Sequence, residues 1–364
     1  MPGPDGEPVA VEIRDLAAEI ERQARGKIDF VVDTRNLKMV LDGGPKLQFP
    51  GPEGDALRMG IRPWAHSQIA EKTQIPARYY ERCRVEAADL LCENVNRWIV
   101  EKERRMLRTL DGHVRAVVSD RFRALDNFDL FFACAKVFDE VGAQIMRADL
   151  SDTRFYMRAV RPDIRAPLID PRRHEFVNDE ICSGVVVSNS EVGAGALKVE
   201  EYALRLKCVN GVIGEDIYER IHLGEKMKAG ILSPETISAT THTIWLHVRD
   251  YIRHAFSIER LQGWAEMYNR TQKVLLPEPT KLTQGSWSGL DVSEYEKNRI
   301  LKHLFEDNEG QTQFGLINAV TATARDLADA ERRAALEHLG YRLLNEEEAA
   351  FQATMVEATV PMKR

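Results

Sequence analysis

Hydrophobic and polar positions alternate through the middle of the chain and change to helical spacing towards its end. The alternation is strongest over 181–212, where a glycine-rich segment separates two strand-like runs. Two apolar runs around Asp111 and Gly112 predict a hairpin over 108–118, because this dipeptide favours a tight turn. Over 236–272, apolar residues recur at steps of three and four, which predicts helices with one buried face.

The same patterns place further elements along the chain. Helices are expected at 11–25, 95–105 and 128–141, two short helices within 62–84 are separated by Gln74–Pro76, and strand-like patterns cover 28–41 and 145–160. A loop rich in proline, glycine and serine over 277–290 precedes the last helices, which include FGLINAVTATARDLAD and RRAALEHLGYRLL.

A run of strands followed by a run of helices predicts the α+β class. We expect an N-terminal mixed antiparallel sheet with helices, and a helical C-terminal region. The patterns divide the chain into an N-terminal helix and hairpin segment (1–60), an α+β core domain (61–225) and the helical C-terminal region (226–364).

Composition narrows the class of protein. The chain has 364 residues, of which 44% are hydrophobic, and this is enough to bury a sizeable core rather than to stay disordered. No stretch reaches the roughly 18 apolar residues of a membrane span, and the start does not resemble a secretory signal. The five cysteines are odd in number and include no Cys-x-x-Cys pair, so we expect a reduced cytoplasmic protein without a structural zinc.

Charge is segregated along the chain. The formal net charge is −7, which argues against a uniformly basic nucleic-acid binder. Two segments are nevertheless basic: 97–123 has eight Lys or Arg against four acids, and 153–173 has six Arg against two Asp. The segment 305–350 is acidic, with ten acids against four Arg. Charged, solvent-exposed faces on different helices and strands would explain this segregation of charge as well as a binding site would.

The basic segments suggest a surface for single-stranded nucleic acid. Guanidinium groups neutralise phosphates, and aromatic rings beside them stack on bases. The candidate residues are Arg121, Arg123, Arg154, Phe155, Tyr156, Arg158, Arg161 and Arg165. The alternatives are that the arginines pair with nearby carboxylates and that Phe155 belongs to the core.

Other motifs are explained by structure at least as well as by chemistry. Gly193 and Gly195 in SNSEVGAGAL, and Asn210 and Gly211 after the next strand, are expected to form structural turns. SNSEVGAGAL lacks the ending of a phosphate-binding loop. The helices within 62–84 could be a helix-turn-helix that presents Arg78, Tyr79, Arg82 and Arg84 to DNA, although simple helix packing is commoner. The spacing of His222, His242, His247 and His254 does not indicate a metal site.

Several segments together resemble a known family. VSDRFRALDN, then SNSEVGAGAL with Cys208-x-Asn210-Gly211, and later FGLINAVTATA occur in the order found in the phage/plasmid-like protein family called domain of unknown function 932. The resemblance covers about 65–344, and Val209 stands where that family leads us to expect threonine. It implies a gene found in prophages or conjugative plasmids, near genes that handle single-stranded DNA. It supplies no catalytic residues.

These observations lead to one expected function and two alternatives. We expect a non-enzymatic DNA-binding protein of phage or plasmid type that binds or anneals single-stranded DNA in recombination or repair. It would work as a homo-oligomer, because sheet edges need covering, and would need no cofactor and no membrane. The first alternative is a protein-interaction factor, an inhibitor or adaptor of a host defence or replication component. The second is a metal-dependent nuclease.

Overall fold

The computed structural model describes residues 13–99, 103–170, 175–222, 234–277, 279, 282, 292–306 and 310–359. The N-terminal half of the chain contains α1 (Ile13–Gly26), β1 (Lys27–Asp33), η1 (Thr34–Asn36), β2 (Lys38–Leu41), β3 (Pro45–Pro50), β4 (Ala56–Ile61), α2 (Pro63–Lys72), α3 (Ala77–Glu86), α4 (Ala88–Trp98), β5 (Arg104–Leu110), β6 (His113–Ser119), α5 (Asn127–Val141), β7 (Gln144–Leu150) and β8 (Phe155–Asp170). The rest contains β9 (Glu175–Asn189), β10 (Leu197–Arg205), β11 (Asn210–Arg220), α6 (Pro234–Ala255), α7 (Ile258–Thr271), α8 (Glu294–Glu306), α9 (Gln313–Asp326), α10 (Ala330–Asn345) and α11 (Glu348–Thr359).

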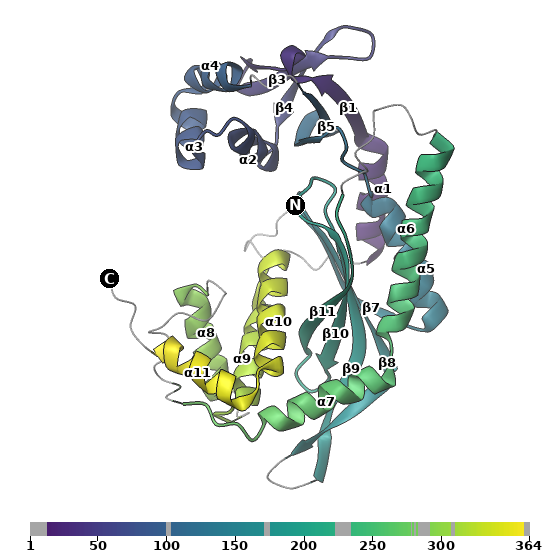
Figure 1. Cartoon of the computed structure of the whole chain (residues 1–364), viewed down its shortest axis with the longest axis vertical. Helices are drawn as coiled ribbons and strands as arrows, with labels where there is room; N and C mark the ends of the chain where they lie inside the picture. The colour runs from purple at the N-terminus through teal and green to yellow at the C-terminus, as the bar shows by residue number, and fades with distance from the viewer. Residues whose placement is uncertain are drawn as a thin grey trace.

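The first sheet, sheet A, has six strands in the order β1-β5-β6-β4-β3-β2. Neighbouring strands in this sheet pair antiparallel, except β4 and β6, which pair parallel. Helices α2, α3 and α4 cover one face, where Leu47, Phe49 and Leu107 from the strands pack with Leu91 of α4. This lobe lies at the top of Figure 1.

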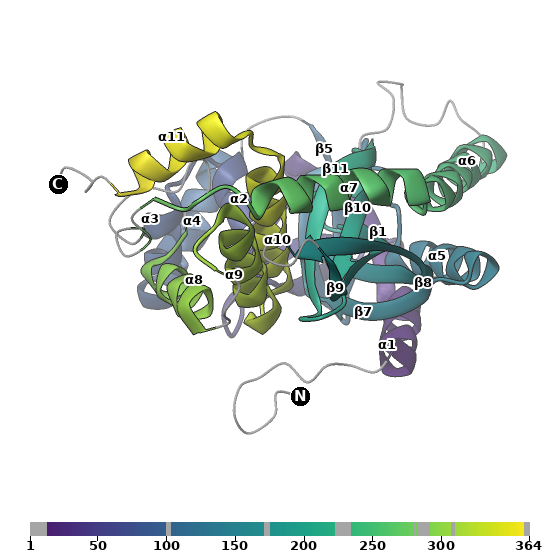
Figure 2. The ribbon, with the colours of Figure 1, turned by 90° about the horizontal axis from the view of Figure 1, so that it is seen from below.

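The second sheet, sheet C, is an antiparallel meander of five strands in the order β11-β10-β9-β8-β7. Side chains of a strand alternate between its two faces, so neighbouring residues of β8 belong to different cores. Phe155 and Met157 pack with α1, α5 and α6, whereas Tyr156 and Val160 face α10. Figure 2 shows helices on both sides of this sheet.

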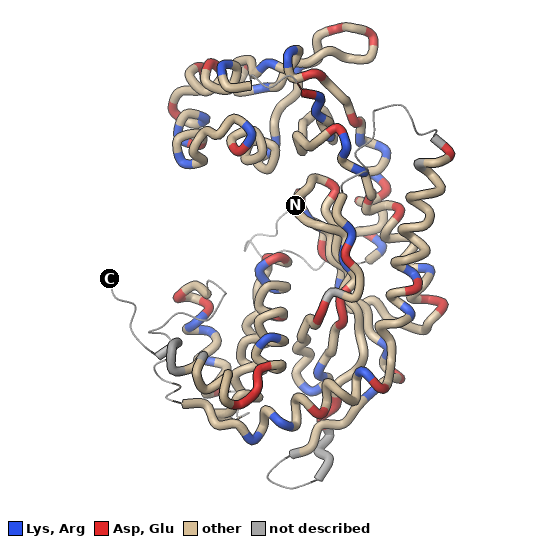
Figure 3. The backbone as a smooth tube through the Cα atoms, viewed as in Figure 1, with Lys and Arg blue, Asp and Glu red and all other residues tan. Residues whose placement is uncertain are grey.

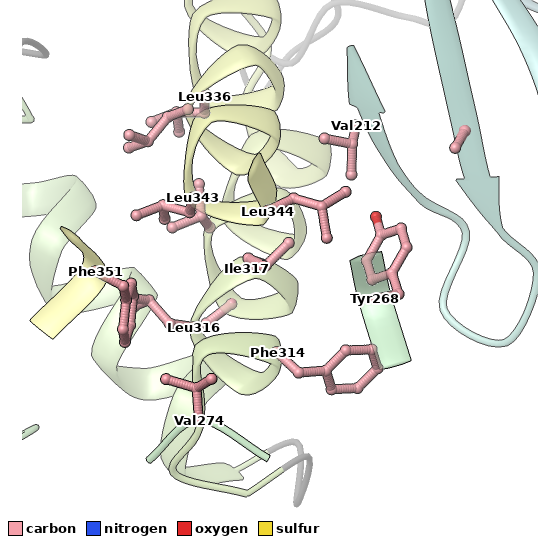
Figure 4. Packing of buried hydrophobic residues seen from close by; sticks show 14 of the residues in the cluster. Val212, Tyr268, Val274, Phe314, Leu316, Ile317, Leu336, Leu343, Leu344 and Phe351 are labelled. Carbon is pink, nitrogen blue, oxygen red and sulfur yellow. The ribbon is translucent and has the colours of Figure 1, made fainter. Parts of the chain in front are cut away.

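The C-terminal helices pack on sheet C through α9. Helix α9 carries its charged residues only at its C-terminal end, and twelve of its residues are buried. Phe314 and Ile317 of α9 meet Tyr268 of α7, Leu344 of α10 and Val212 of β11 in the largest hydrophobic cluster (Figure 4). The C-terminal helices and sheet C therefore share one core.

Most predicted elements agree with the structure, and the class is α+β as expected. The Asp111-Gly112 hairpin is present, and both residues have the positive φ that a tight hairpin turn needs. One boundary is wrong, because residue 60 lies inside β4 of the six-stranded sheet A. The helix predicted over 95–105 is also wrong: α4 ends at Trp98, and β5 begins at Arg104.

Two observations concern the environment of the chain. Among the described residues, no helix is long and apolar enough to cross a membrane. The five cysteines are free thiols, and all of them except Cys208 are buried.

A buried histidine links the first two helices of the sheet A lobe and makes its stability depend on pH. His66 of α2 is buried, and its Nδ1 lies 2.8 Å from the hydroxyl of Tyr80 in α3. Burial lowers the pKa of His66 to about 4, helped by the nearby charge of Arg84. The unfolded chain takes up this proton near pH 6.5, while the folded chain stays neutral until about pH 4.

We therefore predict that His66 removes about 2 kcal/mol of stability between pH 7 and pH 5, because only the unfolded state is protonated there. The measurement is urea unfolding at both pH values for the wild type and His66→Gln, which cannot titrate but can still bond to Tyr80. The variant should show the shallower pH dependence, and His113→Asn, at an exposed histidine, should behave like the wild type. Equal slopes for His66→Gln and the wild type would contradict the assignment.

Candidate binding groove

The connection between β9 and β10 joins the two sheets. Its residues Ser190 to Val192 are buried, and Val192 packs against Ala116 and Val118 of β6, on the face of sheet A that the helices leave free. The Glu191 carboxylate accepts a hydrogen bond from the backbone N–H of Asn127 at 2.7 Å and pairs with Arg115 of β6 at 3.0 Å and with Lys27 of β1. A buried carboxylate is thus neutralised by one cation from each of two strands of sheet A.

A second arginine reinforces this junction. Arg108 of β5 donates to the backbone carbonyl of Glu191 at 2.7 Å and pairs with Asp126 at 2.7 Å and Asp29 at 3.2 Å. Burial alone would raise the pKa of Asp126, but the charges of Arg108 and Lys27 hold it below its ordinary value. The two sheets therefore meet through ion pairs that are shielded from water.

Beside the junction lies a groove of about 980 Å³. Its walls come from α1, from β7 with the turn into β8, and from the start of α10. Its apolar lining includes Ile13 and Met146, which are 37% and 48% exposed. A smaller hollow of about 230 Å³, lined by Arg62 and Trp64, shares Asp152 and Thr153 with it. The smaller hollow thus brings residues of the sheet A lobe next to the groove.

Ion pairs line this groove, and in two of them the acid is the more exposed partner. Arg62 lies 2.6 Å from Asp152, with side-chain exposures of 28% and 63%. Arg154 lies 2.7 Å from Glu331, with exposures of 22% and 50%. Asp329, which caps α10 by accepting from the N–H of Arg332, is exposed as well. Figure 3 shows acidic positions at the start of α10. At these two pairs the carboxylate is the outer partner and the guanidinium lies beneath it. At a third pair in the groove lining, Arg147 with Asp149, the arginine is the more exposed partner, at 36% against 18%.

The structure does not bring the predicted arginines together as one cationic surface. Arg158 is buried between sheet C and α10, 2.7 Å from Glu337 and 3.5 Å from Asp149. Arg161 pairs with Asp163, two residues further along β8. Arg165 pairs with Glu180 of β9 at 3.2 Å. With Arg154 held by Glu331, these four arginines are satisfied within the protein.

The predicted stacking rings are not on the surface either. Phe155 has an exposed fraction of 0% and packs against Phe131 of α5. Tyr156 is buried on the opposite face, where the guanidinium of Arg158 lies 5.9 Å from its ring centre. Stacking of Phe155 on a base is therefore incompatible with this fold, and Tyr156 already has a cation over its ring.

The remaining two predicted arginines follow β6. Arg121 is exposed, and among the described residues it has no charged partner. Arg123 is half-buried, and its backbone is bound at both ends to His222: the Arg123 N–H donates to the His222 carbonyl at 2.9 Å, and the Arg123 carbonyl lies 3.1 Å from Nδ1 of His222. The ring of His222 stacks on Phe122 at 5.0 Å, and burial lowers its pKa.

The predicted turn residues are required by close contacts. Gly193 has a positive φ of 76°. A side chain at Gly195 would collide with the guanidinium of Arg154, and one at Gly211 would collide with the ring of Tyr202. Asn210 begins β11, and its side chain donates to the carbonyl of Asn318 at 3.3 Å. These residues serve the local structure of the two turns.

The structure also bears on two other hypotheses from the sequence, the helix-turn-helix and the metal site. Helices α2 and α3 pack with α4 on sheet A, and Arg82 and Arg84 pair with Glu86 and Glu81 on their own helix. The described residues contain no group of three or more His, Cys, Asp or Glu that could hold a metal ion.

Sequence reasoning missed the acidic side of the groove. Asp329 and Glu331 were not selected, although the acidic excess of 305–350 pointed to them. The contact that makes them relevant joins residues far apart in the chain, such as Arg154 and Glu331.

No family model, curated protein or solved structure matches this chain. The resemblance to the phage/plasmid-like family stays a prediction.

The junction yields a stability prediction. Glu191→Ala should destabilise the protein by about 3–5 kcal/mol, because Lys27 and Arg115 would stay buried without their partner. Chemical denaturation measures the difference. Glu331→Ala, which removes a half-exposed carboxylate from an ion pair of the groove, is the matched control and should cost no more than about 1 kcal/mol. Similar losses in the two variants would show that the junction is not the sensitive site.

Proposed function

We propose that this chain is a non-enzymatic interaction protein whose groove binds a basic segment of a partner protein. The observation that carries the proposal is the direction of the ion pairs, with Asp152 and Glu331 outside and their arginines inside. A ligand that enters the groove meets carboxylates first. Lysine and arginine side chains complement such a rim, whereas phosphates are repelled by it.

The walls of the groove also suit a peptide. Ile13 and Met146 offer exposed apolar surface between the acidic positions. Apolar contacts supply affinity, and the surrounding charges supply specificity and a faster encounter. A segment with both basic and apolar side chains matches this combination.

The proposed biological role is the first alternative that the sequence suggested, a protein-interaction factor. We propose an inhibitor or adaptor of a host defence or replication component, encoded by a phage or a plasmid, as the resemblance to the phage/plasmid-like family implies. The free thiols are compatible with a reducing compartment, and we propose the cytoplasm.

The groove predicts binding that depends on its carboxylates. A fluorescent peptide of alternating lysine and leucine should bind the full chain, and its affinity should fall as salt rises. Asp152→Lys with Glu331→Lys should weaken binding by about tenfold or more, because the rim changes sign. Fluorescence anisotropy measures both effects.

The matched control reverses two carboxylates of the same kind away from the groove. Asp163→Lys with Glu347→Lys changes exposed partners of Arg161 and Arg270 and should leave peptide binding unchanged. Equal weakening of peptide binding by both double variants would show that net charge, and not the groove, causes the effect. Absence of peptide binding at low salt would contradict the proposed function.

Sheet A favours single-stranded DNA as a second candidate ligand. Strands β2 to β6 contain seven Lys or Arg and no acid. Lys38 and Arg58 are exposed and stand opposite Gln48, one on each side. Their neighbours Met39, Leu57 and Met59 pack into the core, so these two cations point away from the helices.

This candidate makes a separate prediction. Binding of a labelled oligonucleotide in a gel-shift assay should fall steeply with salt, and Lys38→Glu with Arg58→Glu should abolish it, because both contacts would be to phosphates. Arg161→Gln is the control, since Arg161 is held by Asp163. Absence of a complex at low salt would remove DNA binding as a function of this face.

A further inference from the structure

The outer strand of sheet A is an unusually regular edge. β1 pairs with β5 over all seven of its residues, without a register shift. It lies at the opposite end of the sheet from β2. The usual means of protecting an edge are a proline, a bulge or a solvent-exposed lysine. β1 has neither of the first two, and the side chain of its lysine, Lys27, is buried against Glu191. Its two other charged residues, Asp29 and Asp33, are paired with Arg108 and Arg35.

The free side of β1 carries unused backbone groups. Thr34, directly after the strand, donates its N–H to the carbonyl of Glu103, on the chain segment that leads into β5. In an antiparallel pair, alternate residues direct their N–H and C=O to the same side. Asp29, Val31 and Asp33 therefore direct theirs away from β5. No backbone hydrogen bond in the described ranges reaches that side of β1.

Apolar side chains accompany this edge. Ile28 is 57% exposed and Val31 is 43% exposed. Ile28 shares a face of the strand with Phe30 and Val32, which belong to the core beneath α2–α4. The core thus continues to the rim of the sheet and ends there in contact with water.

We propose that β1 pairs antiparallel with β1 of a second copy of this chain across a twofold axis. The strand is complementary to itself in one register, in which Phe30 faces Phe30 of the other copy. Ile28 then lies opposite Val32, and Asp29 lies opposite Val31. The two six-stranded sheets join into one, and the apolar rim is covered from both sides.

The charges of the strand select this register. Only registers that match odd residues with odd residues let the outward N–H and C=O groups meet. Two neighbouring registers satisfy this condition. In one of them Asp29 lies opposite Asp29 of the other copy, and in the other Asp29 lies opposite Asp33. Facing carboxylates are destabilising. The proposed register avoids both facing pairs of carboxylates.

The dimer extends the function without depending on it. The groove is lined by α1, β7 and α10, not by β1, so each copy keeps its own groove. Two grooves on one particle allow a partner with two basic segments to bind with higher overall affinity than one groove gives.

Sedimentation velocity of the full chain tests the interface. The wild type should sediment as a species of twice 41.4 kDa. Val31→Lys should raise the dissociation constant by about tenfold or more, because lysine protects an edge strand. Leu41→Lys is the matched control at the other edge of the same sheet, where Leu41 is 54% exposed, and it should stay dimeric.

A second variant separates dissociation from misfolding. Val31→Pro removes only an N–H that points away from β5, so β1 keeps its ladder and circular dichroism should show the wild-type fold. It should nevertheless be monomeric. A monomeric wild type at high protein concentration, a dimer that survives both Val31 variants, or a dimer lost in Leu41→Lys would each overturn the proposal.

A crosslink tests the register directly. Asp29→Cys and Val31→Cys proteins, mixed and oxidised, should form a disulfide-linked heterodimer, because directly opposite residues with shared hydrogen bonds lie about 5.5 Å apart at Cα. Each protein alone should crosslink poorly. Equal crosslinking of Asp29→Cys with itself would contradict this register. Because no step uses the groove, these results stand whether or not a basic peptide binds.

Discussion

A carboxylate buried between two sheets sets the arrangement of this molecule. Glu191 comes from the connection between β9 and β10, and its charge is balanced by Lys27 and Arg115 of sheet A. A buried charge without partners is strongly destabilising, so the sheets are held in the orientation that satisfies it. The smaller hollow beside the groove depends on that orientation, since Arg62 belongs to the sheet A lobe and its partner Asp152 to the turn that precedes β8.

The charge of the surface depends on which partner of an arginine–carboxylate ion pair faces water. Basic segments in a sequence suggest a cationic surface, yet here Arg154 and Arg158 lie beneath Glu331 and Glu337 or beside them. The arginines join α10 to sheet C. Glu337 is buried with Arg158, whereas Glu331 is the more exposed partner of Arg154. A local excess of arginine can therefore mark an internal interface rather than a site for phosphates.

Local features of the sequence predicted most of the fold. Asp111-Gly112 gave the hairpin, and Pro76 gave the break between α2 and α3, because both depend on neighbouring residues. The boundary at residue 60 failed because the partner strands of β4 come from both sides of it along the chain. The site failed for the same reason: Arg158 and Glu337 are 179 positions apart, and no short pattern reports that they meet.

Hydrogen–deuterium exchange of the full chain, with and without a lysine–leucine peptide, tests the central claim most directly. If the acidic rim receives the ligand, the peptide should slow amide exchange over 146–154 and at the start of α10, while β2–β4 should exchange as before. Protection confined to β2–β4, or no protection anywhere, would contradict the account.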